Sequence, residues 1–295
     1  MRILITGARG LVGYHIAAAA PSASLWLTSR GEDPGLGHPY LAADLTQRPE
    51  VEKLIQWAEP DVVIHSAAMT LVDACQEHPD LCWLHNVTPT RHFIEVLAEK
   101  RPQTYFVLVS TDFVYDGFPV IPRPYVEGDY EAPLSVYGAS KLAAEAWVRT
   151  YPGPWAIART ALVYGAAPTA PRDNILLRVL YQLKAGRTMA LFTDQVRTPT
   201  WAADLANGLL LLATEQAQGL YHLAGPTIET PYSFGQKAAA AWGLPTDSIQ
   251  PLTREDLVQP APRPPYSPLS IEKARALGYA PHTPEEAFAK LKPYL

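Results

Sequence analysis

Residues 2–13 read Arg-Ile-Leu-Ile-Thr-Gly-Ala-Arg-Gly-Leu-Val-Gly, an apolar run that passes directly into a glycine-rich turn. The run at 2–6 predicts a short buried strand, and residues 11–20 predict the helix that follows it. A strand that meets a helix through closely spaced glycines is typical of the first unit of a doubly wound α/β fold. The opening of the chain therefore predicts a parallel sheet with helices on its faces.

The three glycines of this turn have the spacing GxxGxxG. Gly7 permits a tight turn, Gly10 lets the backbone approach a pyrophosphate, and Gly13 allows the helix to pack closely on the strand. Glycine triplets also occur in ordinary turns, but the first strand–helix junction favours dinucleotide binding. The predicted cofactor contacts in this turn are Gly7, Arg9, Gly10, Leu11, Val12 and Gly13.

The alternation of strands and helices continues along the chain. Further apolar runs predict strands at 24–28, 61–65, 104–109, 155–160 and 219–223, and helical patterns occupy 11–20, 48–58, 73–100 and 137–151. Strands that alternate with helices pair in parallel. The predicted fold class is α/β, a doubly wound parallel sheet of the Rossmann type.

Beyond residue 165 the pattern loosens. Helical stretches near 173–186, 201–215, 233–243 and 284–292 are separated by loops that contain proline. We expect residues 1–165 to form the dinucleotide-binding domain, with strands also contributed by later segments. Residues 166–295 should form mainly a smaller, mixed substrate-binding lobe over the carboxyl ends of the strands, where ligands bind in open α/β sheets.

Composition limits the classes of function. With 295 residues, 48% of them apolar and 18% charged, the chain can build a sizeable core. The formal net charge of −5 and the lack of a basic run argue against a nucleic-acid partner. The eight histidines form no HExxH pair, so no metal site is predicted.

The chain starts directly in the first predicted strand and contains no apolar run of about 18 residues, so neither a leader nor a membrane span is expected. The two cysteines, Cys75 and Cys82, match neither a CxxC pair nor a set of zinc ligands. Two free thiols suit a reducing compartment. We therefore expect a cytoplasmic protein.

The segment Tyr137-Gly138-Ala139-Ser140-Lys141 carries the predicted chemistry. Residues four apart share a helix face, so the Tyr137 phenol and the Lys141 ammonium can point into one pocket. A nearby ammonium favours the phenolate, which predicts a lowered Tyr137 pKa and a proton donor to a carbonyl. Thr111, just beyond an apolar strand, can supply a second hydrogen bond to the same oxygen. Alone, the motif is an ordinary amphipathic turn; together with the glycine turn and Thr111 it indicates a carbonyl reductase.

Further predicted cofactor contacts lie where later strands end. Arg30 follows the second strand, where NAD-binding proteins usually carry an acidic residue, so Arg30 and Arg9 favour the 2′-phosphate of NADP(H), with NAD(H) as the alternative. Arg30 can equally be a solvated loop residue. Asp44-Leu45 is expected to end a third strand beside the adenine, and Ser66-Ala67-Ala68 a fourth beside the nicotinamide ribose. Both segments can also be plain strand ends.

With these residues in place, the chain resembles the extended short-chain dehydrogenase/reductase superfamily and, within it, the dTDP-4-dehydrorhamnose reductase family. The resemblance covers nearly the whole chain. It rests on the segments Gly7–Gly13, Ser110–Gly117, Tyr137–Lys141, Arg159–Gly165, Asp194–Thr200 and Arg263–Leu269. The second of these, Ser-Thr-Asp-Phe-Val-Tyr-Asp-Gly, discriminates most, because epimerases of the superfamily usually show Val-Tyr-Gly there.

The resemblance implies hydride reduction of a nucleotide-linked 4-keto-6-deoxy sugar. Thr111 and Tyr137 would bond to the carbonyl, Tyr137 would give the proton, and Lys141 would hold the nicotinamide ribose. Asn86 would be a structural amide near the lysine, unless it is an exposed helix residue. The implied substrate contacts are Thr111, Asp112, Val114, Tyr137, Asn174, Arg197 and Arg263. The superfamily also suggests a homodimer.

The sequence departs from the reductase family in two places, and these differences leave the identity of the sugar undetermined. Arg197 stands where the reductases commonly carry glycine, and it can bind a substrate phosphate or pair with a carboxylate. Residues 166–173 do not closely copy the sugar-binding loop. The alternatives are an epimerase or dehydratase of the same superfamily, or a non-catalytic regulatory subunit like the β subunit of methionine adenosyltransferase.

Overall fold

The computed structural model describes residues 1–20, 24–120, 123–168 and 174–295. Six strands form one parallel sheet in the order β2-β1-β3-β4-β5-β9. They are β1 (Arg2–Thr6), β2 (Ser24–Thr28), β3 (Val62–His65), β4 (Tyr105–Thr111), β5 (Trp155–Thr160) and β9 (Gly219–His222). The predicted α/β class and its parallel sheet are confirmed.

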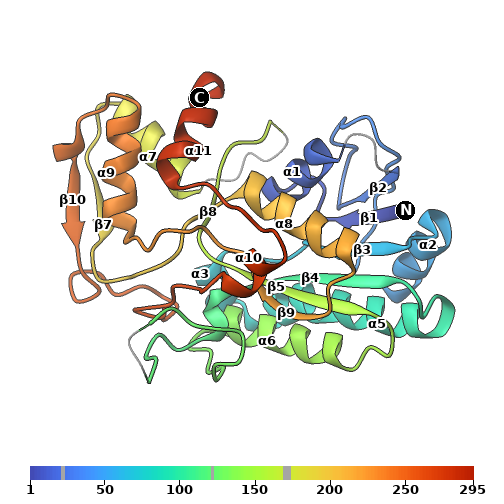
Figure 1. Cartoon of the computed structure of the whole chain (residues 1–295). Coiled ribbons are helices and arrows are strands. Elements are labelled where there is room, and N and C mark those ends of the chain that lie inside the picture. Colours follow the sequence, from blue (N-terminus) through green and yellow to red (C-terminus); the bar gives the residue numbers. More distant parts are fainter. Residues whose placement is uncertain (21–23, 121–122, 169–173) are drawn as a thin grey trace.

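Helices cover both faces of this sheet (Figure 1). One group is α1 (Leu11–Ala19) and α8 (Ala202–Glu215), and the other is α2 (Arg48–Ala58), α5 (Thr88–Lys100) and α6 (Val136–Arg149). Alternate residues of β1 divide between the two cores: Ile3 and Ile5 pack with the first group and Leu4 with the second. This is the side-chain alternation of a strand that is buried on both faces.

The helical stretch predicted over 73–100 is divided into three helices. These are α3 (Val72–Glu77), α4 (Pro79–Asn86) and α5. Pro79 is the first residue of α4 and Pro89 the second of α5, where the missing amide proton costs nothing. His78 leaves the helical region, with φ −129° and ψ 70°, as a residue before proline tends to do.

The strand expected to end at Asp44-Leu45 is not formed, which corrects that prediction. The chain there makes a single parallel bridge between Tyr40 and Leu27, and only Leu41 and Ala43 donate amides toward β2 and the residue that follows it. Proline at position 39 has no amide proton to donate. Ser66-Ala67-Ala68 consequently follows the third strand along the chain, not the fourth.

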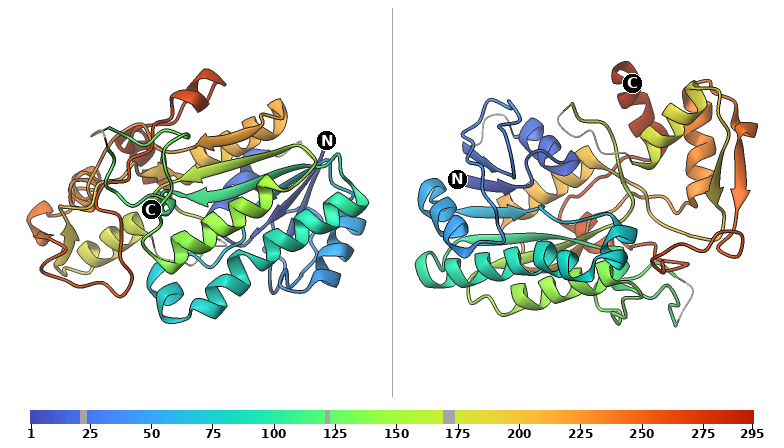
Figure 2. Two further views of the ribbon diagram at one scale, coloured as in Figure 1. Left: turned by 90° about the horizontal axis from the view of Figure 1, so that it is seen from below. Right: turned by 180° about the vertical axis from the view of Figure 1, so that it is seen from behind.

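A smaller group of elements has its own apolar core. It contains α7 (Ile175–Lys184), α9 (Pro231–Ala241), α11 (Pro284–Leu291) and the parallel pair β7 (Met189–Phe192) and β10 (Ile249–Leu252). Figure 2 shows this lobe to one side of the six-stranded sheet in both views. The helix α8 and the strand β9 come from the same half of the chain but pack in the core of the larger domain.

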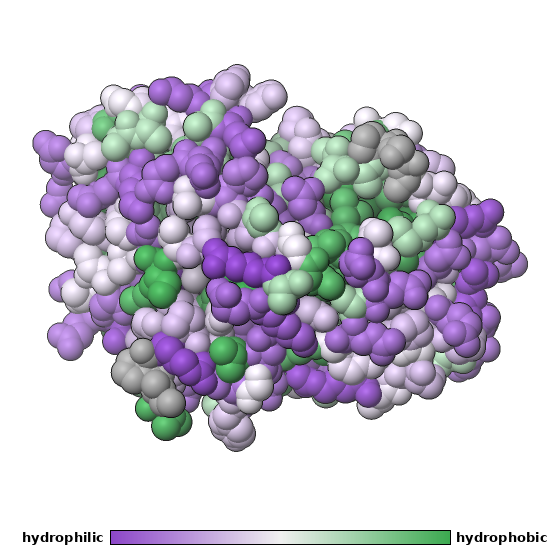
Figure 3. All heavy atoms as spheres, viewed as in Figure 1, coloured by the Kyte–Doolittle hydropathy of each residue, from purple (hydrophilic) through white to green (hydrophobic). Residues whose placement is uncertain are grey.

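Short elements complete the structure. They are the paired strands β6 (Val163–Tyr164) and β8 (Thr200–Trp201), the helix α10 (Glu272–Ala276), and the 3₁₀ turns η1 (Asp112–Val114), η2 (Thr246–Ser248) and η3 (Lys292–Tyr294). On the face drawn in Figure 3, polar side chains dominate and apolar ones form small separate patches. Across the described ranges, no helix has the length and apolar character needed to cross a bilayer.

A buried ion pair joins three elements of the large domain. Arg159 on β5 and Glu145 on α6 both have fully buried side chains and make two contacts, Nε–Oε1 at 2.9 Å and Nη2–Oε2 at 2.6 Å. The Ser110 hydroxyl on β4 donates to the same carboxylate at 2.6 Å. Arg159 also donates to the Tyr115 hydroxyl and to Glu131, at 2.7 and 2.6 Å. The network fixes α6 against the ends of β4 and β5.

We predict that Arg159→Met destabilises the protein by about 3–5 kcal/mol, because Glu145 then loses its buried ion-pair partner and keeps only the contact with Arg149 at the surface. Arg149→Met is the matched control, since Arg149 contacts the same Glu145 carboxylate from the surface at 3.1 Å. Because the Arg149 side chain is 36% exposed, its contact is screened by solvent and should contribute only about 0–1 kcal/mol. Urea unfolding at neutral pH measures the free energy of unfolding of both variants. Equal losses of stability would contradict the importance of the buried Arg159–Glu145 pair.

Candidate active site

The glycine turn is packed so closely that it has no room for side chains at Gly7 and Gly13. A Cβ on Gly13 would lie 2.4 Å from the Gly7 carbonyl oxygen, and Gly7 itself has a positive φ of 74°. The helix α1 begins at Leu11, and its N-cap residue Gly10 makes no side-chain capping bond. The first amides of α1 therefore receive no side-chain cap, which suits a phosphate group.

Two arginines lie together beside this turn, at the end of β2. The Arg9 guanidinium donates to the Arg30 carbonyl at 3.3 Å, and both side chains are exposed. Asp44 lies within range of Arg30: burial opposes its ionisation, but hydrogen bonds from Thr46 and the Arg30 charge lower its pKa overall. Leu45 beside it is buried. The structure thus groups Arg9, Arg30 and Asp44 at one edge of the sheet.

The segment after β3 is bonded to the end of β1. The Ser66 hydroxyl donates to the Thr6 carbonyl at 2.6 Å, and the Ala67 amide donates to the Thr6 hydroxyl at 3.1 Å. Ala67 also lies directly against Gly7. His65 is fully packed at the end of β3, where burial lowers its pKa to about 3, so it is a neutral core residue.

Tyr137 lies in the first turn of α6, whose N-cap Ser135 accepts a hydrogen bond from Gly138. The Tyr137 hydroxyl faces the side chain of Thr111, the last residue of β4. The Phe113 ring packs edge-on against the tyrosine, with centroids 5.8 Å apart. The phenol and the threonine hydroxyl predicted from the sequence are therefore brought together.

The expected lowering of the Tyr137 pKa is wrong for this structure. Burial raises the pKa of Tyr137, and the carboxyl of Asp112 adds to the rise, while the Thr111 hydrogen bond only partly offsets it. Lys141 is itself buried, and desolvation lowers its pKa to about 8 despite the opposing charge of Glu145. The cost of burying either charge outweighs the attraction between phenolate and ammonium.

Asn86 is buried, so its reading as an exposed helix amide is wrong. Its Oδ1 accepts the Met69 amide at 2.7 Å, and its Nδ2 donates to the Met69 carbonyl at 3.1 Å and to the Ser140 hydroxyl at 2.9 Å. Ser140 in turn donates to the Tyr137 carbonyl at 2.7 Å. Asn86 thus ties the segment after β3 to the turn of α6 between Tyr137 and Lys141.

Asp112 is almost fully buried and connects the site to later parts of the chain. Its Oδ2 lies 3.3 Å from Nε of Arg197 and accepts the Ser267 hydroxyl at 2.5 Å. Burial raises the pKa of Asp112, and the Arg197 charge opposes the rise. Of the two roles considered for Arg197, the structure shows the carboxylate partner, and the guanidinium also lies over the Phe113 ring at 5.6 Å.

The remaining predicted contacts are held by structural bonds. Arg263 makes two 2.8 Å bonds to Asp73 on α3, across 190 positions of sequence. Asn174 caps α7 and donates to the Gly165 carbonyl at 2.8 Å. Val114 is buried in the larger core. Of the segment 166–173, residues 169–173 lie outside the described residues.

Sequence reasoning missed three residues that organise the site. Ser140 lies inside the segment Tyr137–Lys141 and Ser267 inside Arg263–Leu269, where other residues carried the prediction. A serine in such a segment does not by itself predict a role in the site. Asp73 lies in a helix of mixed composition, and nothing in its local pattern points to Arg263. Each of the three is defined by a partner more than 50 positions away.

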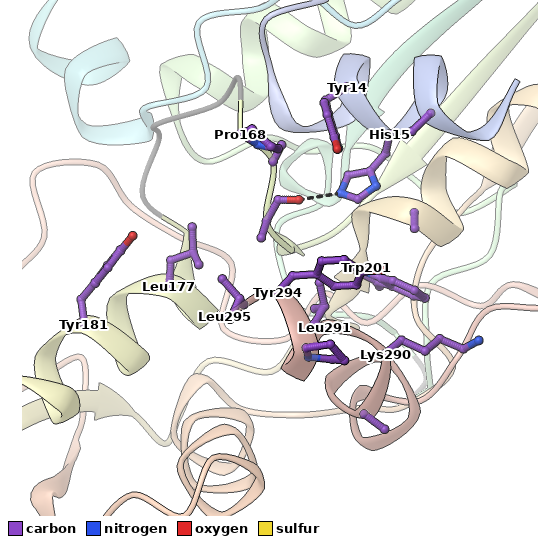
Figure 4. A pocket seen from close by; sticks show the side chains of 16 residues that line it. Tyr14, His15, Pro168, Leu177, Tyr181, Trp201, Lys290, Leu291, Tyr294 and Leu295 are labelled. Atoms are coloured by element: carbon purple, nitrogen blue, oxygen red, sulfur yellow. Dashed lines mark hydrogen bonds between the residues drawn. The ribbon is translucent and has the colours of Figure 1, made fainter. Parts of the chain in front are cut away.

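A cavity of about 1060 Å³ lies elsewhere, between α1, α7 and the C-terminal residues. Figure 4 shows Tyr14 and His15 on one side and Trp201, Leu291 and Tyr294 on the other. Its described lining does not include the residues of the Thr111–Tyr137 site. Within the described ranges, no cluster of three or more His, Cys, Asp or Glu side chains is arranged to hold a metal ion.

Comparison with known proteins identifies relatives over the whole chain. The family profile of the RmlD substrate binding domain matches residues 1–291. The chain is 32% identical over 99% of its length, and 97% of the relative's, to a probable low-salt glycan biosynthesis reductase, Agl14, of Haloferax volcanii. It is 31% identical to the dTDP-4-dehydrorhamnose reductase of Burkholderia thailandensis, covering 92% of this chain and 91% of that one.

Two further similarities bear on cofactor and role. The crystal structure of dTDP-4-dehydrorhamnose reductase from Bacillus anthracis in complex with NADP superposes with a TM-score of 0.84 at 25% identity, covering 100% of this chain and 99% of that one. The β subunit of methionine adenosyltransferase 2 from Xenopus laevis is 29% identical, over 96% of this chain and 84% of the relative.

We predict that Gly13→Ala weakens dinucleotide binding at least tenfold and costs about 1–3 kcal/mol of stability, because the new methyl meets backbone atoms that must move. Gly128→Ala is the control, since its added Cβ would meet no atom within 4 Å. Fluorescence titration and urea unfolding measure the two effects. If Gly13→Ala binds the dinucleotide as tightly as the unmodified protein, the glycine turn is not the phosphate site.

Proposed function

The chain belongs to the family of the RmlD substrate binding domain, and from this membership we propose that it reduces the 4-keto group of a nucleotide-linked 4-keto-6-deoxy sugar with NADPH. The observation that carries the proposal is the Tyr137 phenol facing the Thr111 hydroxyl, with Lys141 one turn further on the same helix. Asn86 and the segment after β3 connect this group to the glycine turn.

The residues present fit a dinucleotide. The uncapped start of α1 at the glycine turn suits the diphosphate, and the Arg9 and Arg30 guanidinium groups suit a 2′-phosphate. Asp44 and Leu45 would border the adenine. Ser66, Ala67, Ala68, Asn86 and Lys141 would border the nicotinamide half. When bound, NADPH supplies the hydride.

The proton is the part of the chemistry that this chain supplies. Because burial raises the Tyr137 pKa, the phenol carries its proton at neutral pH, as a proton donor to a ketone must. Thr111 offers a hydroxyl to the same oxygen, so the two hydrogen bonds would stabilise the negative charge that develops there. The Lys141 ammonium would bond to the ribose and favour the phenolate left after transfer.

The lobe side of the site favours an anionic substrate. Burial lowers the pKa of Arg197, the Asp112 charge raises it, and the charges of Arg263 and Arg254 lower it, so three guanidinium groups lie within electrostatic range. A diphosphate would relieve this repulsion. We propose Asp112, Val114, Asn174, Arg197 and Arg263 as the side chains that border the nucleotide sugar.

One alternative function, a non-catalytic subunit, has specific support, and another, a dehydratase, meets a specific objection. The Xenopus relative supports a non-catalytic subunit that keeps the fold, because a regulator can retain Tyr137 and Lys141. A dehydratase would need a free acid beside Thr111, but the Asp112 carboxylate is occupied by Arg197 and Ser267. We further propose a cytoplasmic location, where NADPH and reduced thiols are maintained.

We predict that the protein oxidises NADPH when a nucleotide 4-keto-6-deoxy sugar is added, and that Tyr137→Phe lowers kcat about 10²–10⁴-fold because the proton donor is lost. NADPH affinity should change little, since the ring is kept. Tyr181→Phe, on an exposed part of α7, is the control and should keep full activity. NADPH binding without turnover on any keto sugar, together with co-purification of a larger synthetase, would instead favour the regulatory subunit.

We predict that Arg30→Ala weakens NADPH binding about 10–100-fold, as loss of a charge-assisted bond to phosphate does, and leaves NADH binding unchanged. Arg275→Ala removes an equally exposed arginine from α10 and is the control. Isothermal titration with each dinucleotide measures the difference. Equal weakening of both cofactors would refute the 2′-phosphate role.

A further inference from the structure

The two cysteines of the chain lie next to each other beside Tyr137. Cys75 is on α3 and Cys82 on α4, and both are free and fully buried. On one continuous helix, residues seven apart would be about 10 Å apart along the axis. The chain instead leaves the helical conformation at His78, between the two helices. The two thiols are thereby brought to one polar cluster, in which Asn86 Nδ2 bonds both to Cys82 Sγ and to the Met69 carbonyl that accepts from Cys75.

The same polar groups that position Tyr137 surround these thiols. Cys75 Sγ donates to the Met69 carbonyl at 3.5 Å, and Cys82 Sγ donates to the Ser140 hydroxyl at 3.3 Å. The Asn86 amide donates to both the Met69 carbonyl and Cys82 Sγ, at 3.1 and 3.4 Å. The sulfur atoms therefore belong to the network that ties α6 to the segment after β3.

The two thiols are electrostatically unequal. The hydrogen bond from Cys75, supported by Ser140, Asn86 and the Lys141 charge, lowers the pKa of Cys82 to about 7 although burial opposes ionisation. The pKa of Cys75 is raised by the same contact and by burial. A thiolate beside a protonated thiol is the arrangement from which disulfides form most readily.

We propose that Cys75 and Cys82 are an oxidisable dithiol, and that a peroxide converts them to a disulfide that slows the reduction proposed above. The Cys82 thiolate attacks a peroxide oxygen, the O–O bond breaks, and sulfenic acid and hydroxide result. The Cys75 sulfur then attacks the Cys82 sulfur, and the S–O bond breaks. In total, two thiols and one hydrogen peroxide give one disulfide and two waters.

Local structure explains how peroxide can reach the two thiols and how the disulfide would slow the reaction. Helix α3 has only six residues and follows the irregular segment between β3 and α3, so local opening costs less than global unfolding. Closing the disulfide draws the Cys82 sulfur toward Cys75 and away from its 3.3 Å contact with the Ser140 hydroxyl. The Ser140 hydroxyl bonds to the Tyr137 carbonyl, so its displacement moves the turn that carries Tyr137 and Lys141.

The test treats the purified full-length protein with hydrogen peroxide and then with dithiothreitol. After peroxide, denaturation and alkylation, we expect no reactive thiols and an intact mass lower by two hydrogens. Turnover of the keto sugar should fall about tenfold or more, because a small displacement of reacting groups has effects of this size, and dithiothreitol should restore it. Mass and alkylation need no activity, so they decide on the dithiol even if the proposed reaction fails.

Cys75→Ala and Cys82→Ala are the matched controls. Neither variant can form the intramolecular disulfide. In Cys82→Ala, turnover after peroxide treatment should stay within about twofold of turnover before it, because the remaining thiol, Cys75, is poorly ionised. Two thiols still free after native peroxide treatment would overturn the dithiol. If the disulfide forms completely but turnover of the keto sugar is unchanged, the proposed effect of the disulfide on the reaction is wrong.

Discussion

The buried pair of Arg159 and Glu145 is the constraint on which the site depends. Ser110, bonded to the same carboxylate, immediately precedes Thr111, and Glu145 lies one turn beyond Lys141 on α6. Neither charge is stable in the core without the other, so the strand end and the helix have one favourable arrangement. The distance between the threonine hydroxyl and the tyrosine phenol therefore follows from an ion pair that touches neither.

Burial then sets the protonation of the site. Desolvation raises the pKa of Tyr137 and of Asp112 and lowers that of Lys141, so it favours the neutral form of each group. In reduction, a protonated phenol is the useful state, and the structure provides it without a lowered pKa. The nearby dithiol shares this environment, in which one thiol ionises at the expense of its neighbour.

Long-range side-chain bonds join the lobe to the dinucleotide-binding domain. Arg197 and Ser267 both reach Asp112, and Arg263 reaches Asp73. The substrate side of the site is thus assembled from segments that lie 85 to 190 positions apart in the chain. Its side-chain bonds come from the convergence of these segments and from no single motif.

The sequence by itself determined the elements whose signals are local. The apolar runs at 24–28 and 155–160, the turn at Gly7–Gly13 and the four-residue spacing of Tyr137 and Lys141 each predict their structure from neighbouring residues alone. Only the tertiary structure decided the direction of the Tyr137 pKa, the partner of Arg197 and the partner of Arg263. These depend on burial and on contacts between distant segments, and neither quantity is encoded in a short window of residues.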